Sequence, residues 1–485
     1  MTPSRARRVW VHTLGCDKNL VDSEAVLGRF GARGVTVARS PDEADVWVLN
    51  TCGFIAASRA DSWDALAELA AAKDRRRTLV VMGCLAQEHA AEIAARFPAV
   101  DVVAGVGNFG AVVDAALDGA AGPLVGAPEA ARYDGFADRP LLTPAHVAFV
   151  KIGEGCGCSC SFCRIPRIRG PLRSRRAADI VAEAGALAAR GVREIQLVSQ
   201  NTSDWGRDFG SDLVALVTDL SGVPDLRRIR LLYLYPGHLS VAAARRLLSL
   251  PKVVPYLDLP IQHASPAVLR AMRRPPDAAA MADFFLSLRA ELPELVLRTT
   301  VLLGFPGETE EDVEMLADFL ARVEFDHLGT YRYSPEPGTP AAALPDRVPD
   351  EEVADREARL LDLQAEVALR RQRGRLGGAY SAVVDAVVPA IDVAETLGAL
   401  REGEWAPGWN RTRVAFVGDA AGPVALARTV HYGYDLDGTV LLDGGGRRPG
   451  EWLTADLVAV TAWDALAVAR PDGNPNGGGA ACKPV

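Results

Sequence analysis

The sequence predicts an α/β protein with three domains: an amino-terminal parallel α/β sheet, a partial (β/α)6 barrel and a small carboxy-terminal β-barrel. Three observations lead to this fold class. Apolar strands alternate with helices over the first 120 residues, six further strand and helix units follow within residues 145–373, and short β-rich runs separated by Gly, Asp and Pro fill residues 374–470. At 485 residues, 49% of them hydrophobic, the chain is long enough for several cores.

The amino-terminal domain is expected over residues 1–120. Its predicted strands are 9–14, 45–50, 78–83 and 100–107. A helix over 19–34, closed by Gly31 or Gly34, follows the first strand, and an alanine-rich helix follows the second. This alternation predicts a parallel sheet covered on both faces, with ligands beyond the carboxyl ends of its strands.

Three cysteines fall at that expected edge. Cys16, Cys52 and Cys84 follow the first three strands by no more than three residues. A single free cysteine often only fills a core, and that interpretation stays open for each of them. Because all three would converge at one edge of a parallel sheet, a cluster held by three thiolates is also possible.

A second group of cysteines opens the middle domain. Residues 121–144, rich in Gly, Pro and Ala, are predicted to be a linker, and the strand at 145–155 then delivers the segment CGCSCSFC. In it Cys156, Cys160 and Cys163 have the spacing C-x3-C-x2-C, which suits a four-iron cluster with one iron left open. A disulfide-rich loop or a zinc knuckle is the alternative. No further Cys or His follows within several dozen residues to complete a zinc site.

Six strand and helix units make up the middle domain, residues 145–373. After the first strand, the expected strands are 194–199, 228–234, 254–260, 295–304 and 326–334. Polar residues stand at their carboxyl ends, where such barrels carry out chemistry: Gln200, Asn201, Tyr235, Gln262, His263 and the segment GFPGE at 304–308. They predict a cofactor and substrate pocket, with a buried structural role as the alternative for each. GFPGET lacks the lysine and hydroxyl of a phosphate loop, which excludes a nucleoside triphosphatase of that type.

The carboxy-terminal region follows a long charged helix at 349–374. Its β-rich runs, which predict a small β-barrel, are 380–388, 412–418, 424–432, 439–444 and 455–463. Residues 375–470 carry eight Arg and no Lys against twelve acidic residues, so this barrel suits a basic protein partner better than RNA. The tail at 471–485 is predicted to be disordered, and its Cys482 to be incidental.

Charge and hydropathy agree with a cytoplasmic protein. The net charge is −9 with a pI near 5.5, which does not suit a surface that follows a phosphate backbone. The sequence shows no signal peptide and no run of about eighteen apolar residues. We therefore expect no membrane association and reduced thiols, so that clustered cysteines indicate metal.

The quoted motifs resemble a known family. GEGCGCSCSFC with IPRIRG resembles the cluster loop of radical S-adenosylmethionine (radical SAM) enzymes, and residues 9–470 resemble the methylthiotransferases. LGCDKNLVDSE, NTCGFI, MGCLAQ, PYLDLPIQHASPAVLRAMRRP and FDHLGTYRYSPEPGTPA are similar to the branch that modifies a ribosomal protein. The tRNA branch would show a GCQMN-like start and Ser-Gly after Gln262. Asp17, Cys158 and Asn201 depart from the pattern of the ribosomal branch.

The resemblance implies two 4Fe-4S clusters and S-adenosylmethionine as cofactors. Cys156, Cys160 and Cys163 would hold the cluster that cleaves S-adenosylmethionine, and Cys16, Cys52 and Cys84 a second cluster that carries sulfur. Cys158 would be a bystander, and the implied cofactor contacts are Phe162, Gln262 and Arg298.

The implied product is a methylthio group on the β-carbon of an aspartate in ribosomal protein twelve of the small subunit. An electron donor such as a flavodoxin or ferredoxin would be a partner, and the last domain would be a TRAM barrel. Two alternatives remain: a tRNA adenosine methylthiotransferase, and a non-catalytic iron–sulfur protein that serves redox or RNA binding.

Overall fold

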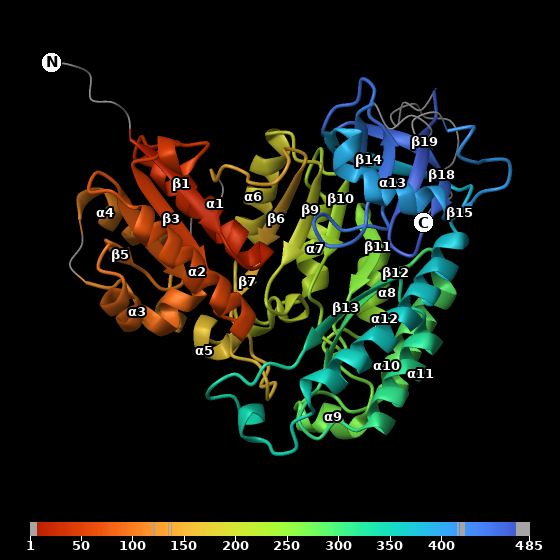
Figure 1. Ribbon diagram of the computed structural model, residues 1–485, viewed down its shortest axis with the longest axis horizontal. Coiled ribbons are helices and arrows are strands. Elements are labelled where there is room, and N and C mark those ends of the chain that lie inside the picture. Colours follow the sequence, from red (N-terminus) through yellow and green to blue (C-terminus); the bar gives the residue numbers. More distant parts are fainter. Residues whose placement is uncertain are drawn as a thin grey trace.

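The computed structural model describes residues 7–119, 122–133, 135–136, 138–414, 417 and 422–471. Cys482 and all but the first residue of the predicted tail lie outside these residues. Figure 1 shows the amino-terminal domain (red to orange) beside the middle domain (yellow to green), with the carboxy-terminal barrel (blue) at one end of the middle strands. The α/β fold class and the terminal β-barrel are thus confirmed.

The amino-terminal sheet is parallel, with the order β2-β1-β3-β4-β5. Its strands are β1 (Arg8–Thr13), β2 (Thr36–Val37), β3 (Val46–Thr51), β4 (Thr78–Gly83) and β5 (Val102–Val103). Its helices are α1 (Asp17–Ala32), α2 (Ala56–Ala72), α3 (Cys84–Arg96) and α4 (Phe109–Asp118). Strand residues alternate between the two faces, so Val46 and Val48 pack with α1 and α4, whereas Trp47 and Leu49 pack with α2 and α3. The short edge strand β2 was not predicted from the sequence.

The middle domain contains the six predicted strands as an open parallel sheet in sequence order. They are β6 (Val147–Lys151), β9 (Glu194–Val198), β10 (Arg228–Leu231), β11 (Val253–Asp258), β12 (Val296–Leu303) and β13 (His327–Arg332), and β7 (Gly153–Glu154) pairs with β8 (Arg173–Ser174) in a separate ribbon. The helices are α5 (Ile165–Arg169), α6 (Ala177–Ala189), α7 (Leu213–Ser221), α8 (Val241–Ser249), α9 (Pro266–Ala271), α10 (Ala278–Glu291), α11 (Glu310–Val323) and α12 (Asp350–Arg373). The helices α6, α7, α8, α10, α11 and α12 share one apolar core with the sheet.

The carboxy-terminal barrel closes through the pairing of β14 with β18. Its elements are β14 (Ala379–Val388), α13 (Ala394–Arg401), β15 (Glu404–Trp405), β16 (Val424–Arg428), β17 (Val440–Asp443), β18 (Trp452–Val460) and β19 (Ala465–Ala469). The predicted strand at 412–418 is wrong for those of its residues that the structure describes, which are 412–414 and 417. Residues 412–414 form a turn, because the Asn410 side chain accepts the N–H groups of Thr412 and Arg413, both at 3.1 Å.

Buried ion pairs join the domains. Within the predicted linker, Arg139 is fully buried and pairs with Glu24 of α1 and, at 3.0 Å, with Glu183 of α6. At the amino end of the middle strands, Glu194 accepts from Arg428 of the barrel at 3.0 Å. The carboxy-terminal barrel therefore occupies the amino ends of these strands and leaves their carboxyl ends to the amino-terminal domain.

Candidate iron–sulfur and cofactor site

The structure brings the three amino-terminal cysteine turns together at one edge of the sheet. Cys16 precedes α1, Cys52 follows β3, and Cys84 is the first residue of α3. A Cβ atom added at Gly15, whose φ is +92°, would lie 2.9 Å from Cys52 Sγ, and one at Gly53 would lie 2.9 Å from the Cys84 backbone. Such close approach leaves no room for side chains between the turns. The arrangement fits a group held by three thiolates.

A cation from the middle domain reaches this amino-terminal site. Arg169, the last residue of α5, is 2% exposed and donates to Asn19 Oδ1 at 2.6 Å and to Asp22 Oδ2 at 2.8 Å. Burial raises the pKa of the Cys84 thiol to about 12, against the opposing effect of Arg169. A thiol of this kind becomes a thiolate when a metal displaces its proton, and the guanidinium then balances the charge.

The second group of cysteines lies in one loop after β7. The Cys156 N–H donates to Gly170 O at 3.1 Å, and Gly155, with φ of +71°, has no space for a Cβ beside Pro171 O. Cys160 Sγ lies 3.9 Å from Tyr235 Oη and 3.7 Å from Arg274 Nη1. Donors this close to a ligand sulfur stabilise a thiolate and adjust the potential of a cluster. All four thiols of the loop are half-buried.

Cys158 lies with Asp204 and His238 in a set whose ligand atoms are all within 4.8 Å of one another. Asn201 Nδ2 lies 2.8 Å from Asp204 Oδ2, 3.5 Å from Cys158 Sγ and 3.2 Å from His238 Nδ1, and its two hydrogens can serve two of these three atoms. His238 Nδ1 also pairs with Asp204 Oδ1 at 2.7 Å. Asn201 Oδ1 accepts the Ser203 N–H, which fixes the orientation of its amide. Cys158 and Asn201, which both depart from the pattern of the ribosomal branch, are therefore in contact. An aspartate at 201 would offer only acceptors to the carboxylate and the sulfur.

The three predicted cofactor contacts lie in different surroundings. Phe162 packs against a buried cluster that includes Met272 and Phe305. Gln262 has φ of +70°, and its backbone bridges Thr300 and Leu302 of β12 at the carboxyl edge. Arg298 is near the amino end of β12 and pairs with Asp258 at 3.0 Å and with Asp437 of the terminal barrel at 3.3 Å. These roles stay predictions.

Other polar residues of the rim bind one another. His263 accepts the Ser265 N–H at 2.9 Å and lies 3.5 Å from Glu308. Glu308 in turn accepts the Gly304 N–H at 3.1 Å and pairs with Arg356 of α12 at 2.8 Å. The GFPGE turn is thus held by its own glutamate, which supports the structural alternative for His263 and this segment.

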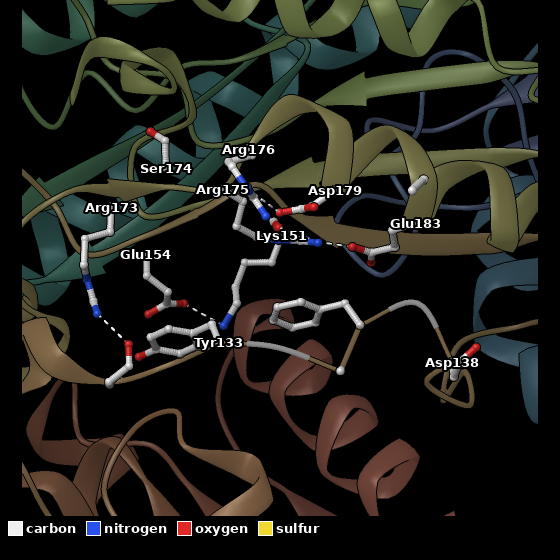
Figure 2. A pocket seen from close by; sticks show the side chains of 14 residues that line it. Tyr133, Asp138, Lys151, Glu154, Arg173, Ser174, Arg175, Arg176, Asp179 and Glu183 are labelled. Atoms are coloured by element: carbon white, nitrogen blue, oxygen red, sulfur yellow. Dashed lines mark hydrogen bonds and ion pairs between the residues drawn. The ribbon is translucent and has the colours of Figure 1, made fainter. Parts of the chain in front are cut away.

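Figure 2 shows the cavity beside the linker, with a volume of about 550 Å³. Lys151 extends beside the Tyr133 ring and pairs with Glu154 at 2.6 Å, and Arg175 pairs with Glu183 at 2.7 Å. Among the residues that the structure describes, four cationic and four acidic side chains line the cavity, and none of the described cysteines does. This cavity is therefore distinct from both cysteine sites.

The sequence interpretation missed the charged residues that join the two sites. Asp22, Glu154, Lys151 and Arg169 are buried together between the domains. A signal was present in α1, because Asp22 stands on the apolar face of an amphipathic helix. Such a residue is nearly always paired when buried, but a helical pattern does not identify its partner.

Two family models match the chain. Residues 8–105 match the model described as "Uncharacterized protein family UPF0004", and residues 150–320 match the "Radical SAM superfamily". None of the helices in the described part of the chain is both long and apolar enough to span a bilayer.

Curated relatives match over most of the chain. A ribosomal protein uS12 methylthiotransferase RimO from Anaeromyxobacter sp. (strain Fw109-5) is 37% identical over 94% of this chain and 92% of its own length. The protein of the same name from Thermosynechococcus vestitus is 42% identical over 77% of this chain and 84% of its own length. Among solved structures, the radical S-adenosylmethionine methyltransferase TsrM from Kitasatospora setae matches with a TM-score of 0.49 at 15% identity, covering 69% of this chain and 77% of that one.

These findings confirm the resemblance drawn from the cysteine motifs. Membership of the radical SAM superfamily implies S-adenosylmethionine and a 4Fe-4S cluster as cofactors. With identities of 37–42% over most of its length, the chain belongs to the RimO family of radical SAM methylthiotransferases.

Proposed function

We propose that this chain adds a methylthio group to the β-carbon of an aspartate in ribosomal protein uS12. The observation that carries the proposal is the convergence of Cys16, Cys52 and Cys84 at one sheet edge, within a chain that also presents the C-x3-C-x2-C loop. A methylthio transfer needs both a radical source and a sulfur carrier, and two three-cysteine sites supply both.

Each site has a distinct role in the proposal. Cys156, Cys160 and Cys163 would hold the 4Fe-4S cluster that binds S-adenosylmethionine, with Phe162, Gln262 and Arg298 as the predicted cofactor contacts. Cys16, Cys52 and Cys84 would hold the second 4Fe-4S cluster, with one iron open for sulfur. When bound, the cofactors supply a radical able to take hydrogen from an unactivated carbon.

Side chains of the protein would tune these sites. Arg274 and Tyr235 approach Cys160, so they would stabilise its thiolate. Arg169 would balance negative charge next to Cys84, and its hydrogen bond to Asn19 links the loop after Cys163 to the helix after Cys16. The middle domain thereby contributes to the amino-terminal site.

The acidic chain suits a basic protein substrate. The net charge is −9, and residues 375–470 carry eight Arg against twelve acidic residues. Asn201, which is more typical of the tRNA branch, has a local explanation in its contact with Cys158. Protein modification is therefore favoured over tRNA modification. We also propose a cytoplasmic location and an electron donor such as a flavodoxin or ferredoxin.

The test incubates the reconstituted, reduced enzyme with an aspartate-containing peptide of uS12 and, separately, with tRNA. We expect the mass gain of a methylthio group on the peptide aspartate only. A gain only on tRNA would support the adenosine alternative instead. Failure to form 5′-deoxyadenosine from S-adenosylmethionine would favour the non-catalytic iron–sulfur alternative.

A further inference from the structure

Glu336 lies in the loop after β13, and its carboxylate links the middle domain to the amino-terminal domain. The residue is 2% exposed. Its Oε2 pairs with Arg59 of α2 and accepts from Arg164 Nη1 at 3.3 Å, while its Oε1 accepts the Ala56 N–H at 3.0 Å. The Ser334 hydroxyl also donates to Oε1, at 2.6 Å, so one buried carboxylate receives two guanidinium groups, a hydroxyl and a backbone amide.

The partners of Glu336 stand next to the proposed cluster ligands. Arg164 directly follows Cys163, and Ala56 begins the helix that follows Cys52. Arg164 also pairs with Glu88, in the first turns of the helix that Cys84 begins, at 2.6 Å. The same short network therefore holds the backbone beside a cysteine of the radical loop and beside two cysteines of the amino-terminal site.

Glu336 accepts the first N–H group of helix α2. Its N-cap residue, Ile55, provides no side-chain hydrogen bond. The Ala56 N–H instead donates to Glu336 Oε1 at 3.0 Å, with Ser334 Oγ as a second acceptor at 3.4 Å, and a carboxylate at this position is stabilised by the helix dipole. Arg59, one turn later, lies 3.5 Å from Gly53 O in the Cys52 turn. Movement of Glu336 would therefore be transmitted to the Cys52 turn.

We propose that Glu336 is a positioning residue that sets the separation and orientation of the two cysteine sites. This inference rests on the proposed function. It adds to that function a residue, Glu336, that holds no cofactor itself. A displacement of about 1 Å between reacting groups can cost about 100-fold in rate. Removing the carboxylate would take its partner from half-buried Arg59 and one of two carboxylates from buried Arg164, which keeps Glu88. The start of α2 would then shift relative to the radical loop, while the other ion pairs still join the domains. Cleavage of S-adenosylmethionine needs only the radical loop, whereas product formation needs both sites.

The first experiment compares Glu336→Gln with the wild type. We expect full iron content, 5′-deoxyadenosine formed at a rate within about threefold of wild type, and 10- to 100-fold less methylthiolated peptide per 5′-deoxyadenosine. Glu357→Gln is the matched control. It removes the same charge from a carboxylate of α12 that accepts from Thr330 and Arg332 of β13, and should leave the ratio unchanged.

A second readout needs no turnover. Pulsed electron paramagnetic resonance on the reduced protein should show a longer or broader distance distribution between the two clusters in Glu336→Gln. In the protein without clusters, amide exchange at Ala56 should be faster than in wild type, because its acceptor is weakened. Arg59→Gln, which removes one partner only, should change both measurements in the same direction and by less.

These measurements separate the inference from the proposed function. If the wild type modifies neither peptide nor tRNA, the proposed function fails, while the distance and the exchange rate still test the role of Glu336. An unchanged product ratio with an unchanged distance overturns the positioning role. Loss of iron from Glu336→Gln, or a parallel fall of both products, would also overturn it, since either result indicates a general structural defect.

Discussion

The two cysteine sites differ in how the chain builds them. Cys156, Cys160 and Cys163 come from a single loop of eight residues, whereas Cys16, Cys52 and Cys84 come from three turns more than 30 residues apart. The loop is closed by hydrogen bonds to its own neighbourhood, such as that between Cys156 and Gly170. The amino-terminal site exists only because β1, β3 and β4 are adjacent and parallel. One site therefore depends on local spacing and the other on sheet topology.

The largest effects are expected from replacing a cysteine in either site, because the iron content and the reaction products should then show what each site does. Cys16→Ala and Cys156→Ala should each lose about half the iron, because each removes one ligand of a three-thiolate site. Cys156→Ala should abolish formation of 5′-deoxyadenosine. Cys16→Ala should retain it and make no methylthiolated product. Iron analysis and chromatography of the nucleoside give both results, and complete loss of iron from either variant would contradict two independent sites.

Glycine substitutions test whether topology or local spacing controls each site. Gly15→Ala should destabilise the amino-terminal site by about 1–2 kcal/mol or more, since φ is +92° and the new Cβ would lie 2.8 Å from Cys52 Cβ. Gly157→Ala is the matched change in the radical loop, where nothing lies within 4 Å of an added Cβ. Urea unfolding and iron content should therefore change in the first variant only. If both variants lost the same stability and the same amount of iron, the two sites would not differ in their dependence on sheet topology and local spacing.

Acid should weaken the buried ion pairs between Glu194 of the middle domain and Arg428 of the carboxy-terminal barrel, which belong to neither cysteine site. Burial alone would raise the pKa of the Glu194 carboxyl, but Arg428, Arg230 and Arg228 outweigh it and lower that pKa to about 2. A pKa lower in the folded than in the unfolded chain stabilises the fold above the unfolded value of about 4.3, and this stability is lost as the pH falls toward 2.

We expect the free energy of unfolding of the cluster-free protein to fall between pH 5 and pH 2, with a contribution from Glu194 of at most ~3 kcal/mol in total. Urea titrations at several pH values measure it. Glu194→Gln should flatten the dependence while lowering stability at pH 7, since the arginines lose their counter-charge. An equally steep profile in this variant would contradict the assignment.

The smallest effect is expected at Cys158. Cys158→Ala should keep full iron and change product formation by less than about threefold, because Asn201, Asp204 and His238 retain their bonds to one another. Iron analysis and the peptide assay measure it. A loss of iron comparable to that of Cys156→Ala would instead show that the radical loop uses a fourth thiolate.

The cysteine positions were predictable because they depend on strand order. Apolar runs of strand length alternating with helices indicate parallel strands, and Cys16, Cys52 and Cys84 follow those strands directly. The same reasoning predicted the six strands of the middle domain. It failed at residues 412–414, where the side chain of Asn410 forms a turn that a count of apolar residues does not detect.

By itself, the sequence determined the fold class, the two cysteine groups and the family, because periodicity and motif spacing are local properties. Tertiary structure alone decided which charges meet across domains. Arg169 reaches Asn19 and Asp22, and Glu336 joins Arg59 to Arg164, over separations of more than 140 residues. An ion pair depends on two side chains reaching one buried point, and only the packing of both domains defines that point.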